Sequence, residues 1–504
     1  MDQLKHKTLQ GLMYLGVGKG AGKLISFVNT LLLARLLSPE DYGLMAIVMV
    51  IVGFIGFFNE IGLGSAIKQR LDINQQQLNG CFTLALLISS LLYLGLYFAS
   101  PAIASYFEHD ILTDILRFIA FTFILGAIIA VPDALIARDM RFKIYAGIEF
   151  VTIILQCAIT LMLAWYGFKV WALAWGFVAA QCAKTCFILY FSNWVPSRFG
   201  NIREASDLMK FGATVTYSRI TWYFYNNAST LIIVKVLNPQ QLGIYSMAAT
   251  LAALPTLHIT SMVIQIASPL FSKLQQDFTR LNNALLRLTS GIALIGFPIM
   301  LGMALTSSEL VPVMLGPQWF EAIFPLQILC IIGLFKSVDP LITQAFISVG
   351  KANITARYTT LCALMIPIGV YTGAIYGGLI GVAIGLVVTY PLSSIYLFYA
   401  ARIHLEFSMR RYLKALQTPL EACLIMAVCV FGFEYLSISI GFDSLLWLLI
   451  SKTLIGILSY VLFLVYVRQS GLKDCYEVLL ELGVSKQKIN RWPFTLLKDK
   501  TSVI

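Results

Sequence analysis

The chain has 504 residues, of which 59% are hydrophobic and only 12% are charged. Soluble domains carry about 25% charged residues, so this composition excludes an ordinary soluble protein and indicates a polytopic membrane protein. The net charge of +11 does not indicate nucleic-acid binding, because the sequence contains no soluble segment large enough for a basic nucleic-acid-binding domain.

Apolar runs of about 20 residues, the length that crosses a bilayer, recur along the whole chain. The first run is too polar for a cleaved signal peptide, so we expect it to be retained. The tail over residues 468–504 alternates apolar and charged residues and is compatible with an amphipathic helix at the membrane surface. We predict an all-α polytopic membrane protein with fourteen transmembrane helices, near residues 11–36, 42–63, 79–100, 112–132, 146–166, 170–192, 211–236, 242–270, 284–306, 319–340, 355–376, 379–400, 416–439 and 443–467.

The loops between these helices alternate in charge. Lysine and arginine gather in every second loop and at both chain ends, whereas the other loops carry acids such as Glu40, Asp41 and Glu309. Because short cytoplasmic loops are enriched in basic residues, we predict that both termini are cytoplasmic.

The chain contains an internal repeat. The end of the first span, L-S-P-E-D-Y-G over residues 37–43, matches L-N-P-Q-Q-L-G over residues 237–243 at an offset of 200 without a gap. Tyr166-Gly167 also matches Tyr376-Gly377 at an offset of 210. Six spans per repeat give the two halves the same orientation, which predicts a parallel pseudo-repeat. The predicted domains are a six-helix lobe over 1–197, a second over 198–415, two additional helices over 416–467 and a cytoplasmic tail over 468–504.

Polar residues form a stripe along the first helix of each half. Charges at membrane depth usually face a bundle interior or a water-filled cavity, so we expect these two stripes to line a cavity that holds an anionic ligand. Arginine and lysine suit phosphate, and aromatic rings suit sugars. The candidate substrate-binding residues are Lys19, Lys23 and Asn29 in the first helix and Arg219, Trp222, Tyr223 and Asn226 in the second.

Each candidate also has a structural interpretation. The cations could pair with acids of neighbouring helices, and Trp222 and Tyr223 could serve packing alone. Arg35 and Lys235 lie near helix ends, where snorkelling or capping is the favoured role. Lys184 and Lys336 are further candidates for the cavity, whereas Lys452 lies outside the repeat.

The sequence predicts no catalytic residues, no metal site and no cofactor. Nine cysteines lie mostly within spans as packing residues, and the four histidines are scattered. A membrane enzyme would need paired acids or a metal–diphosphate site in a sizeable loop, and the loops are short. Coupling of transport to protons or Na⁺ would need an intramembrane carboxylate, for which the candidates are Glu60, Asp133, Glu149, Asp339 and Glu421.

Several segments resemble bacterial polysaccharide transporters of the Wzx type, which flip lipid-linked oligosaccharides. The resemblance lies in ARLLSPEDYGLMAI (34–47), EIGLGSAIKQ (60–69), RFKIYAGIE (141–149) and the segment that starts at Leu310-Val311-Pro312. It implies the fold of the multidrug/oligosaccharidyl-lipid/polysaccharide exporters, with two six-helix lobes around a central cavity lined by spans one and seven. It also implies alternating access and a location in the cell inner (cytoplasmic) membrane.

The substrate implied by this resemblance is an undecaprenyl-pyrophosphate-linked oligosaccharide repeat unit for exopolysaccharide, capsule or O-antigen of lipopolysaccharide. We expect a monomer whose partners are this lipid-linked oligosaccharide, membrane lipids and polysaccharide polymerase machinery. A lipid II flippase and a multidrug/cation antiporter of the same superfold are the alternatives. The antiporter would be expected to carry a carboxylate where this chain carries cations.

Overall fold

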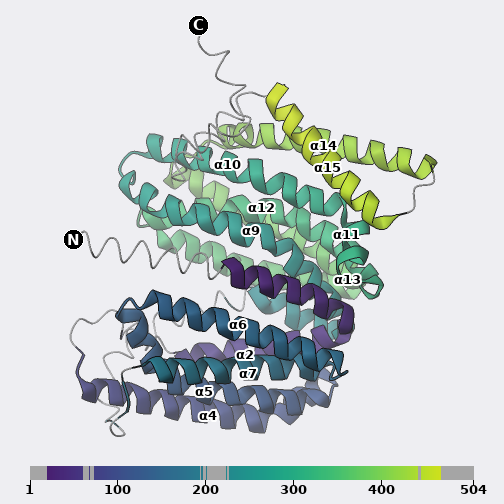
Figure 1. Ribbon diagram of the computed structural model, residues 1–504. Helices are drawn as coiled ribbons and strands as arrows, with labels where there is room; N and C mark the ends of the chain where they lie inside the picture. Colours follow the sequence, from purple (N-terminus) through teal and green to yellow (C-terminus); the bar gives the residue numbers. More distant parts are fainter. Residues whose placement is uncertain are drawn as a thin grey trace. The chain divides into compact units, whose positions relative to one another are not determined.

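A computed structural model describes residues 20–60, 67, 73–192, 194–196, 200, 223, 226–440 and 444–466 (Figure 1). All regular secondary structure in these residues is helical, which confirms the all-α prediction. The chain divides into two compact units, Met1–Ser246 and Met247–Ile504. The predicted helix in the tail over 468–504 lies outside the described residues.

In the first unit, long apolar helices pack side by side around α5 (Figure 1). Ile115, Leu116 and Ile119 of α5 are fully buried, and α5 contacts α2, α4, α6 and α7. Its central position explains its nearly uninterrupted apolar sequence. The helices of this unit cover residues 20–36, α2 Pro39–Glu60, α4 Gln75–Phe107, α5 Ile111–Arg138, α6 Phe142–Trp165, α7 Val170–Phe191, residues 226–236 and the start of α9 Pro239–Lys273.

A charge within this unit is satisfied at a break in a helix. Pro101 lacks an N–H, so the carbonyl of Tyr97 in α4 loses its helical donor. The hydroxyl of Ser100 and the Nε of Arg117 donate to that carbonyl at 2.8 and 3.3 Å. The guanidinium also lies 4.4 Å from the centroid of the Tyr97 ring. Arg117 therefore stabilises a proline break and is not available as a ligand-binding cation.

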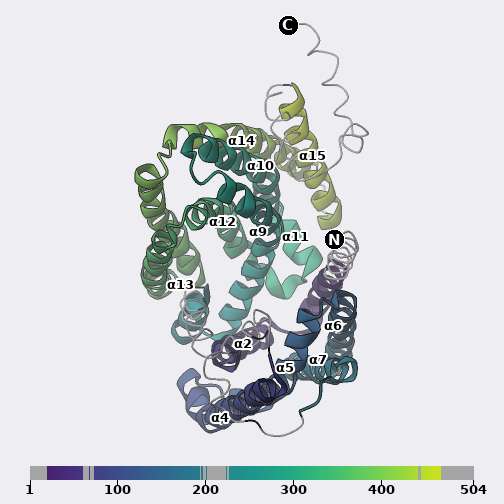
Figure 2. The ribbon, with the colours of Figure 1, turned by 90° about the vertical axis from the view of Figure 1, so that its left-hand side faces the viewer.

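In its described residues, the second unit continues α9 and adds six more helices and a 3₁₀ turn (Figure 2). Eleven helices of the described chain are long and apolar enough to cross a membrane, and the protein is a multi-pass membrane protein. The elements of this unit are α10 Phe278–Leu305, α11 Ser307–Met314, η2 Pro317–Ala322, α12 Ile323–Ser348, α13 Ala352–His404, α14 Met409–Ile440 and α15 Leu445–Tyr466.

The 53-residue helix α13 is an antiparallel hairpin of two spans. Gly378 interrupts it with φ 56° and ψ −141°. On either side of this point the backbones touch: a Cβ at Gly369 would meet the Gly385 backbone, and a Cβ at Gly373 would meet Gly381. α13 thus provides the predicted spans 355–376 and 379–400, and the arrangement is consistent with fourteen spans.

The first unit contains an equivalent hairpin in α6 and α7. Lys169, directly before α7, has φ 49° and ψ −134°, close to the values of Gly378. Gly176 packs against Thr160 as Gly385 packs against Gly369. The equivalent positions 169 and 378 are 209 residues apart, and so are 176 and 385. Because the Tyr-Gly pairs before these turns are 210 residues apart, the second turn is one residue shorter than the first. The hairpin geometry supports the predicted repeat.

A buried ion-pair cluster joins α15 to the rest of the second unit. The Nζ of Lys452 lies 2.6 Å from Oε1 of Glu309 in α11 and 3.1 Å from Oε1 of Glu434 in α14. The side chains of Lys452 and Glu309 are 1% and 7% exposed. Glu309 was expected in an acidic outer loop. It lies in a short helix, where it is buried and supplies the counter-charge of Lys452.

The strained turn at Lys169 gives a first prediction. A non-glycine residue in such a sparsely populated conformation costs about 1–3 kcal/mol, so Lys169→Gly should raise thermal stability by about 1 kcal/mol or more. Lys169→Ala is the control, since it removes the charge and keeps the Cβ. Thermal unfolding of the purified variants in detergent measures both, and equal melting temperatures for the two would contradict the assignment.

The ion-pair cluster gives a second prediction. Lys452→Ala leaves the buried Glu309 carboxylate without its partner and should cost about 3–5 kcal/mol of stability. Replacing Lys452, Glu309 and Glu434 together by leucine should recover most of that loss, because no uncompensated charge then remains. Unfolding midpoints of the single and triple variants test this. If the triple variant were less stable than Lys452→Ala, uncompensated buried charge would not explain the loss of stability in Lys452→Ala, and this prediction would be wrong.

Candidate functional site

The two copies of the repeated motif form the same helix–helix junction. In both copies, the helix before the motif ends with a backbone hydrogen bond. The N–H of Leu37 in the first copy and of Leu237 in the second donates to the carbonyl four residues earlier, at 2.8 Å in both. The next helix then starts at Pro39 or Pro239. Ser38 accepts from the N–H of Asp41 at 3.3 Å, and Asn238 accepts from the N–H of Gln241 at 2.8 Å. Different residues thus provide equivalent N-caps at positions 38 and 238.

These two junctions pack directly against each other. A Cβ at Gly43 would overlap the carbonyl group of Pro239, and a Cβ at Gly243 would overlap the carbonyl group of Pro39. The contact is reciprocal, as the repeat requires, and only glycine permits it. The motif L-x-P-x-x-x-G therefore brings the starts of α2 and α9 into backbone contact.

Tyr223, a candidate substrate-binding residue, packs on α2. Its hydroxyl lies 2.9 Å from the Val50 carbonyl and 3.3 Å from the Met49 carbonyl. Its ring centroid lies 5.0 Å from that of Phe57, and Gly53 leaves the space for its hydroxyl. In this conformation the tyrosine packs on α2, and Asn226 is exposed.

The stripe on the first helix divides between solvent-accessible and packed positions. Lys23 and Ser26 are exposed. Gly22 is buried against Ile153 of α6. Asn29 is half-buried, and its Oδ1 has no hydrogen-bond partner in the described part of the chain. A half-buried polar side chain with an unsatisfied acceptor is suited to a polar ligand.

Three candidates, Lys19, Arg219 and Trp222, lie outside the described residues, so their roles stay predictions. The helix-end cation Lys235 is placed as expected. Its Nζ donates to the Tyr106 carbonyl at the end of α4 at 2.9 Å and lies 3.3 Å from Glu108. Lys235 therefore caps a helix.

Three lysines within predicted spans form no ion pair with any residue the structure describes: Lys23, Lys184 and Lys336. Lys23 and Lys336 are exposed and Lys184 of α7 is half-buried. An ammonium at membrane depth without a carboxylate must face water or an anionic ligand. These lysines are the described groups best suited to bind an anion.

Among the acids considered for ion coupling, Asp339 of α12 is the most buried for which exposure is described, at 2%. Glu421 accepts a bond from Gln417 at 2.7 Å on the same turn of α14. Asp133 of α5 is half-buried.

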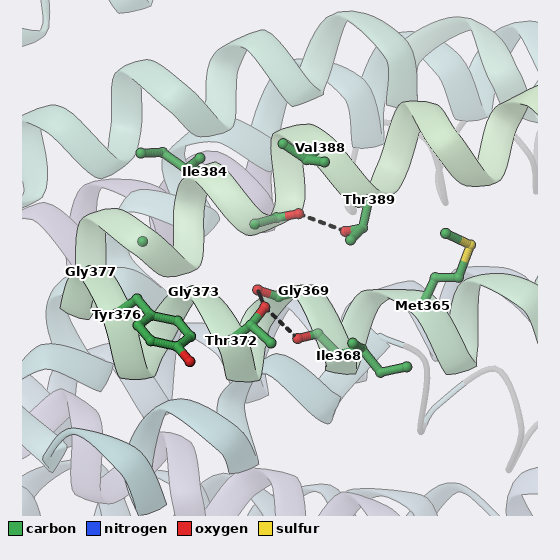
Figure 3. A pocket seen from close by; sticks show the side chains of 12 residues that line it. Met365, Ile368, Gly369, Thr372, Gly373, Tyr376, Gly377, Ile384, Val388 and Thr389 are labelled. Carbon is green, nitrogen blue, oxygen red and sulfur yellow. Dashed lines mark hydrogen bonds between the residues drawn. The ribbon is translucent and has the colours of Figure 1, made fainter.

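A cavity of about 560 Å³ follows the glycine-lined seam of α13 (Figure 3). No charged residue lines it, and the Thr372 and Thr389 hydroxyls bond to carbonyls of their own helix. A second cavity of about 440 Å³ includes Lys452, whose Nζ already faces two glutamates. Neither cavity offers an uncommitted cation, so neither is suited to an anionic head group.

Comparison with known proteins places the chain in a family. Residues 32–324, more than half of the chain, match the family described as polysaccharide biosynthesis protein. The chain belongs to this family. It is 23% identical over 423 residues to the lipopolysaccharide biosynthesis protein WzxC of Escherichia coli K12, covering 82% of this chain and 85% of that protein. It is 24% identical over 464 residues to the succinoglycan biosynthesis transport protein ExoT of Rhizobium meliloti, covering 90% and 92%.

Solved structures confirm the expected fold. The inward closed form of the lipid II flippase MurJ matches with a TM-score of 0.73 at 14% identity, covering 91% of this chain and 99% of that one. An inward-facing multidrug transporter of the same superfamily matches with a TM-score of 0.58 at 16% identity, covering 76% and 94%. The chain therefore shares the fold of these transporters.

Charges outside the two stripes have structural roles that the stripe pattern does not predict. Lys452 was set apart from the cavity candidates because it lies outside the repeat, and it forms ion pairs with Glu309 and Glu434. The available signal was Glu434, an acid inside the span that precedes Lys452, because two opposite charges in adjacent apolar helices are expected to pair.

The reciprocal junction gives a third prediction. Gly43→Ala and Gly243→Ala each force a methyl group into a carbonyl and should each cost about 1–3 kcal/mol of stability. Because either substitution separates the same two helix starts, the double variant should cost less than the sum of the single variants. Thermal unfolding of the purified variants gives the values.

The matched control is Gly56→Ala in α2, where an added Cβ meets nothing within 4 Å. This substitution should leave stability unchanged or raise it, since alanine favours helix. Strict additivity of the two junction variants would contradict a shared contact.

Proposed function

We propose that this protein is a flippase that moves undecaprenyl-pyrophosphate-linked oligosaccharide repeat units across the cell inner (cytoplasmic) membrane by alternating access. The units would serve exopolysaccharide, capsule or O-antigen synthesis. In this proposal both termini are cytoplasmic, the protein acts as a monomer and polysaccharide polymerase machinery takes up its product.

The observation that carries the proposal is the set of span lysines that form no ion pair with a carboxylate in the described part of the chain, Lys23, Lys184 and Lys336. An ammonium group at membrane depth that has no carboxylate partner favours an anionic ligand over a cationic one. A pyrophosphate-linked sugar has an anionic head that lysine and arginine can bind, while its prenyl tail remains in lipid. The same charges disfavour a multidrug/cation antiporter. Membership in the polysaccharide biosynthesis family favours an oligosaccharide substrate over lipid II.

Removing the cations tests this function. The double variants Lys23→Gln/Lys184→Gln and Lys19→Gln/Arg219→Gln should each lower surface polysaccharide at least about tenfold, because one charge-assisted hydrogen bond contributes about 1.5–3 kcal/mol. The measurement is surface polysaccharide in cells that depend on this protein, normalised to its abundance in the membrane.

Lys273→Gln is the control, since Lys273 is an exposed residue at the end of α9. It should export normally. Normal export by both double variants at normal abundance would rule out the cationic cavity. Accumulation of a lipid-linked oligosaccharide inside the variant cells would identify the substrate class, and accumulation of lipid II would favour the alternative flippase.

A further inference from the structure

Four exposed cations of the second unit gather where α13 ends and α14 begins. They are Arg402 in the last turn of α13 and Arg410, Arg411 and Lys414 in the first turns of α14, and we call them the α13–α14 corner. None of the four forms an ion pair with any residue that the structure describes. Glu406, in the turn between the two helices, is also exposed. The corner therefore carries an excess of positive charge that the described protein does not neutralise.

Buried contacts hold this corner in place. Tyr412 of α14 is 3% exposed, and its ring centroid lies 5.1 Å from that of Phe398 of α13 and 5.6 Å from that of Phe407. The side chain of Asn282 in α10 donates to the Leu405 carbonyl at 2.7 Å. The first turn of α14 therefore packs beside the last turns of α13, and the cations of both helices lie at the same end of the unit.

The cations continue helix faces that are otherwise apolar and exposed. On α14, one such face consists of Leu413, Leu420, Leu424, Val428 and Phe431. On α13, the corresponding face consists of Ile384, Val388, Leu392, Ile395 and Tyr399. At about 100° per residue, Arg402 lies on the face of α13, and Arg410 and Lys414 lie at the edge of the face of α14. Lipid tails that cover these two faces would bring their head groups to the cations.

The length of α14 places its cations at the depth of the head groups. The helix has 32 residues. At a rise of 1.5 Å per residue it extends about 48 Å, whereas the hydrocarbon core of a bilayer is about 30 Å thick. All three cations of α14 precede Ala415. Because the hydrocarbon core does not accommodate unpaired charges, this end of the helix lies in the polar layer that borders the core.

An anionic phospholipid joins a phosphate to acyl chains, so it can contact the cations and the apolar faces at once. We propose that the α13–α14 corner binds the phosphate of an anionic phospholipid of the surrounding membrane. A soluble phosphate would use the cations and leave the apolar faces uncovered, so the geometry favours a lipid. This inference concerns the outer surface of the second unit and does not rest on the identity of the transported substrate.

Thermal unfolding of the purified full-length protein in detergent micelles tests this site. Phosphatidylglycerol, phosphatidylcholine and inorganic phosphate are titrated separately at constant ionic strength. A ligand that binds the native state raises its melting temperature by mass action. Phosphatidylglycerol should raise the melting temperature of the wild type more than phosphatidylcholine does, and inorganic phosphate at the same concentration should have no effect.

The variant Arg402→Gln/Arg410→Gln/Lys414→Gln should need at least about tenfold more phosphatidylglycerol for the same rise in melting temperature. The reason is that each basic residue at an anionic lipid surface contributes about fivefold to binding. The variant Arg402→Lys/Arg410→Lys keeps the charges and should retain the response. It also separates loss of charge from loss of folding if the glutamine variant does not fold.

The matched control is Lys169→Gln/Lys273→Gln/Arg280→Gln, which removes three exposed cations from other parts of the chain and should respond like the wild type. Three results would each overturn the proposal: a wild type that does not distinguish the two lipids, an equal response to inorganic phosphate, or an equal loss of response in the two glutamine variants. None of these results depends on polysaccharide export, so they are separate from the test of the proposed function.

Discussion

An ammonium group inside a bilayer is stable only when a carboxylate or carbonyl faces it, or when water or an anionic ligand reaches it. This constraint divides the lysines of the protein into two groups. Lys452 meets two glutamates and Lys235 caps a helix, so both have structural roles. Lys23, Lys184 and Lys336 have no such partner in the described part of the chain, and the proposed function follows from that difference.

The backbone obeys a similar constraint, since a carbonyl freed by proline inside a membrane helix needs another donor. Ser100 and Arg117 donate to the carbonyl that Pro101 frees in α4. The Tyr460 hydroxyl of α15 donates to the Leu294 carbonyl that Pro298 frees in α10, at 2.8 Å. In both places the break is filled by a side chain of the protein.

The helices and the repeat could be predicted from the sequence because each depends on local pattern. Span length follows from apolar runs, and the motif at 37–43 and 237–243 specifies the same turn twice. The partners of individual side chains could not be predicted, since they depend on how helices rotate about their axes. Tyr223 lay on a polar stripe in sequence, yet its hydroxyl meets carbonyls of α2 because Gly53 leaves room for it. Glu309 reached Lys452 across 143 residues, a distance that no local pattern encodes.

The reciprocal contact between Gly43 and Gly243 also bears on how the two halves of this chain could have diverged. Each glycine is required because it contacts the backbone of the other copy. The effect of a substitution in one half therefore depends on the structure of the other half. Capping residues at 38 and 238 have no such dependence, and they already differ as serine and asparagine. After a duplication, the positions where the copies touch would therefore change slowly and together, while the rest of each copy could drift independently. The motif that matches at an offset of 200 contains the positions at which the two copies touch.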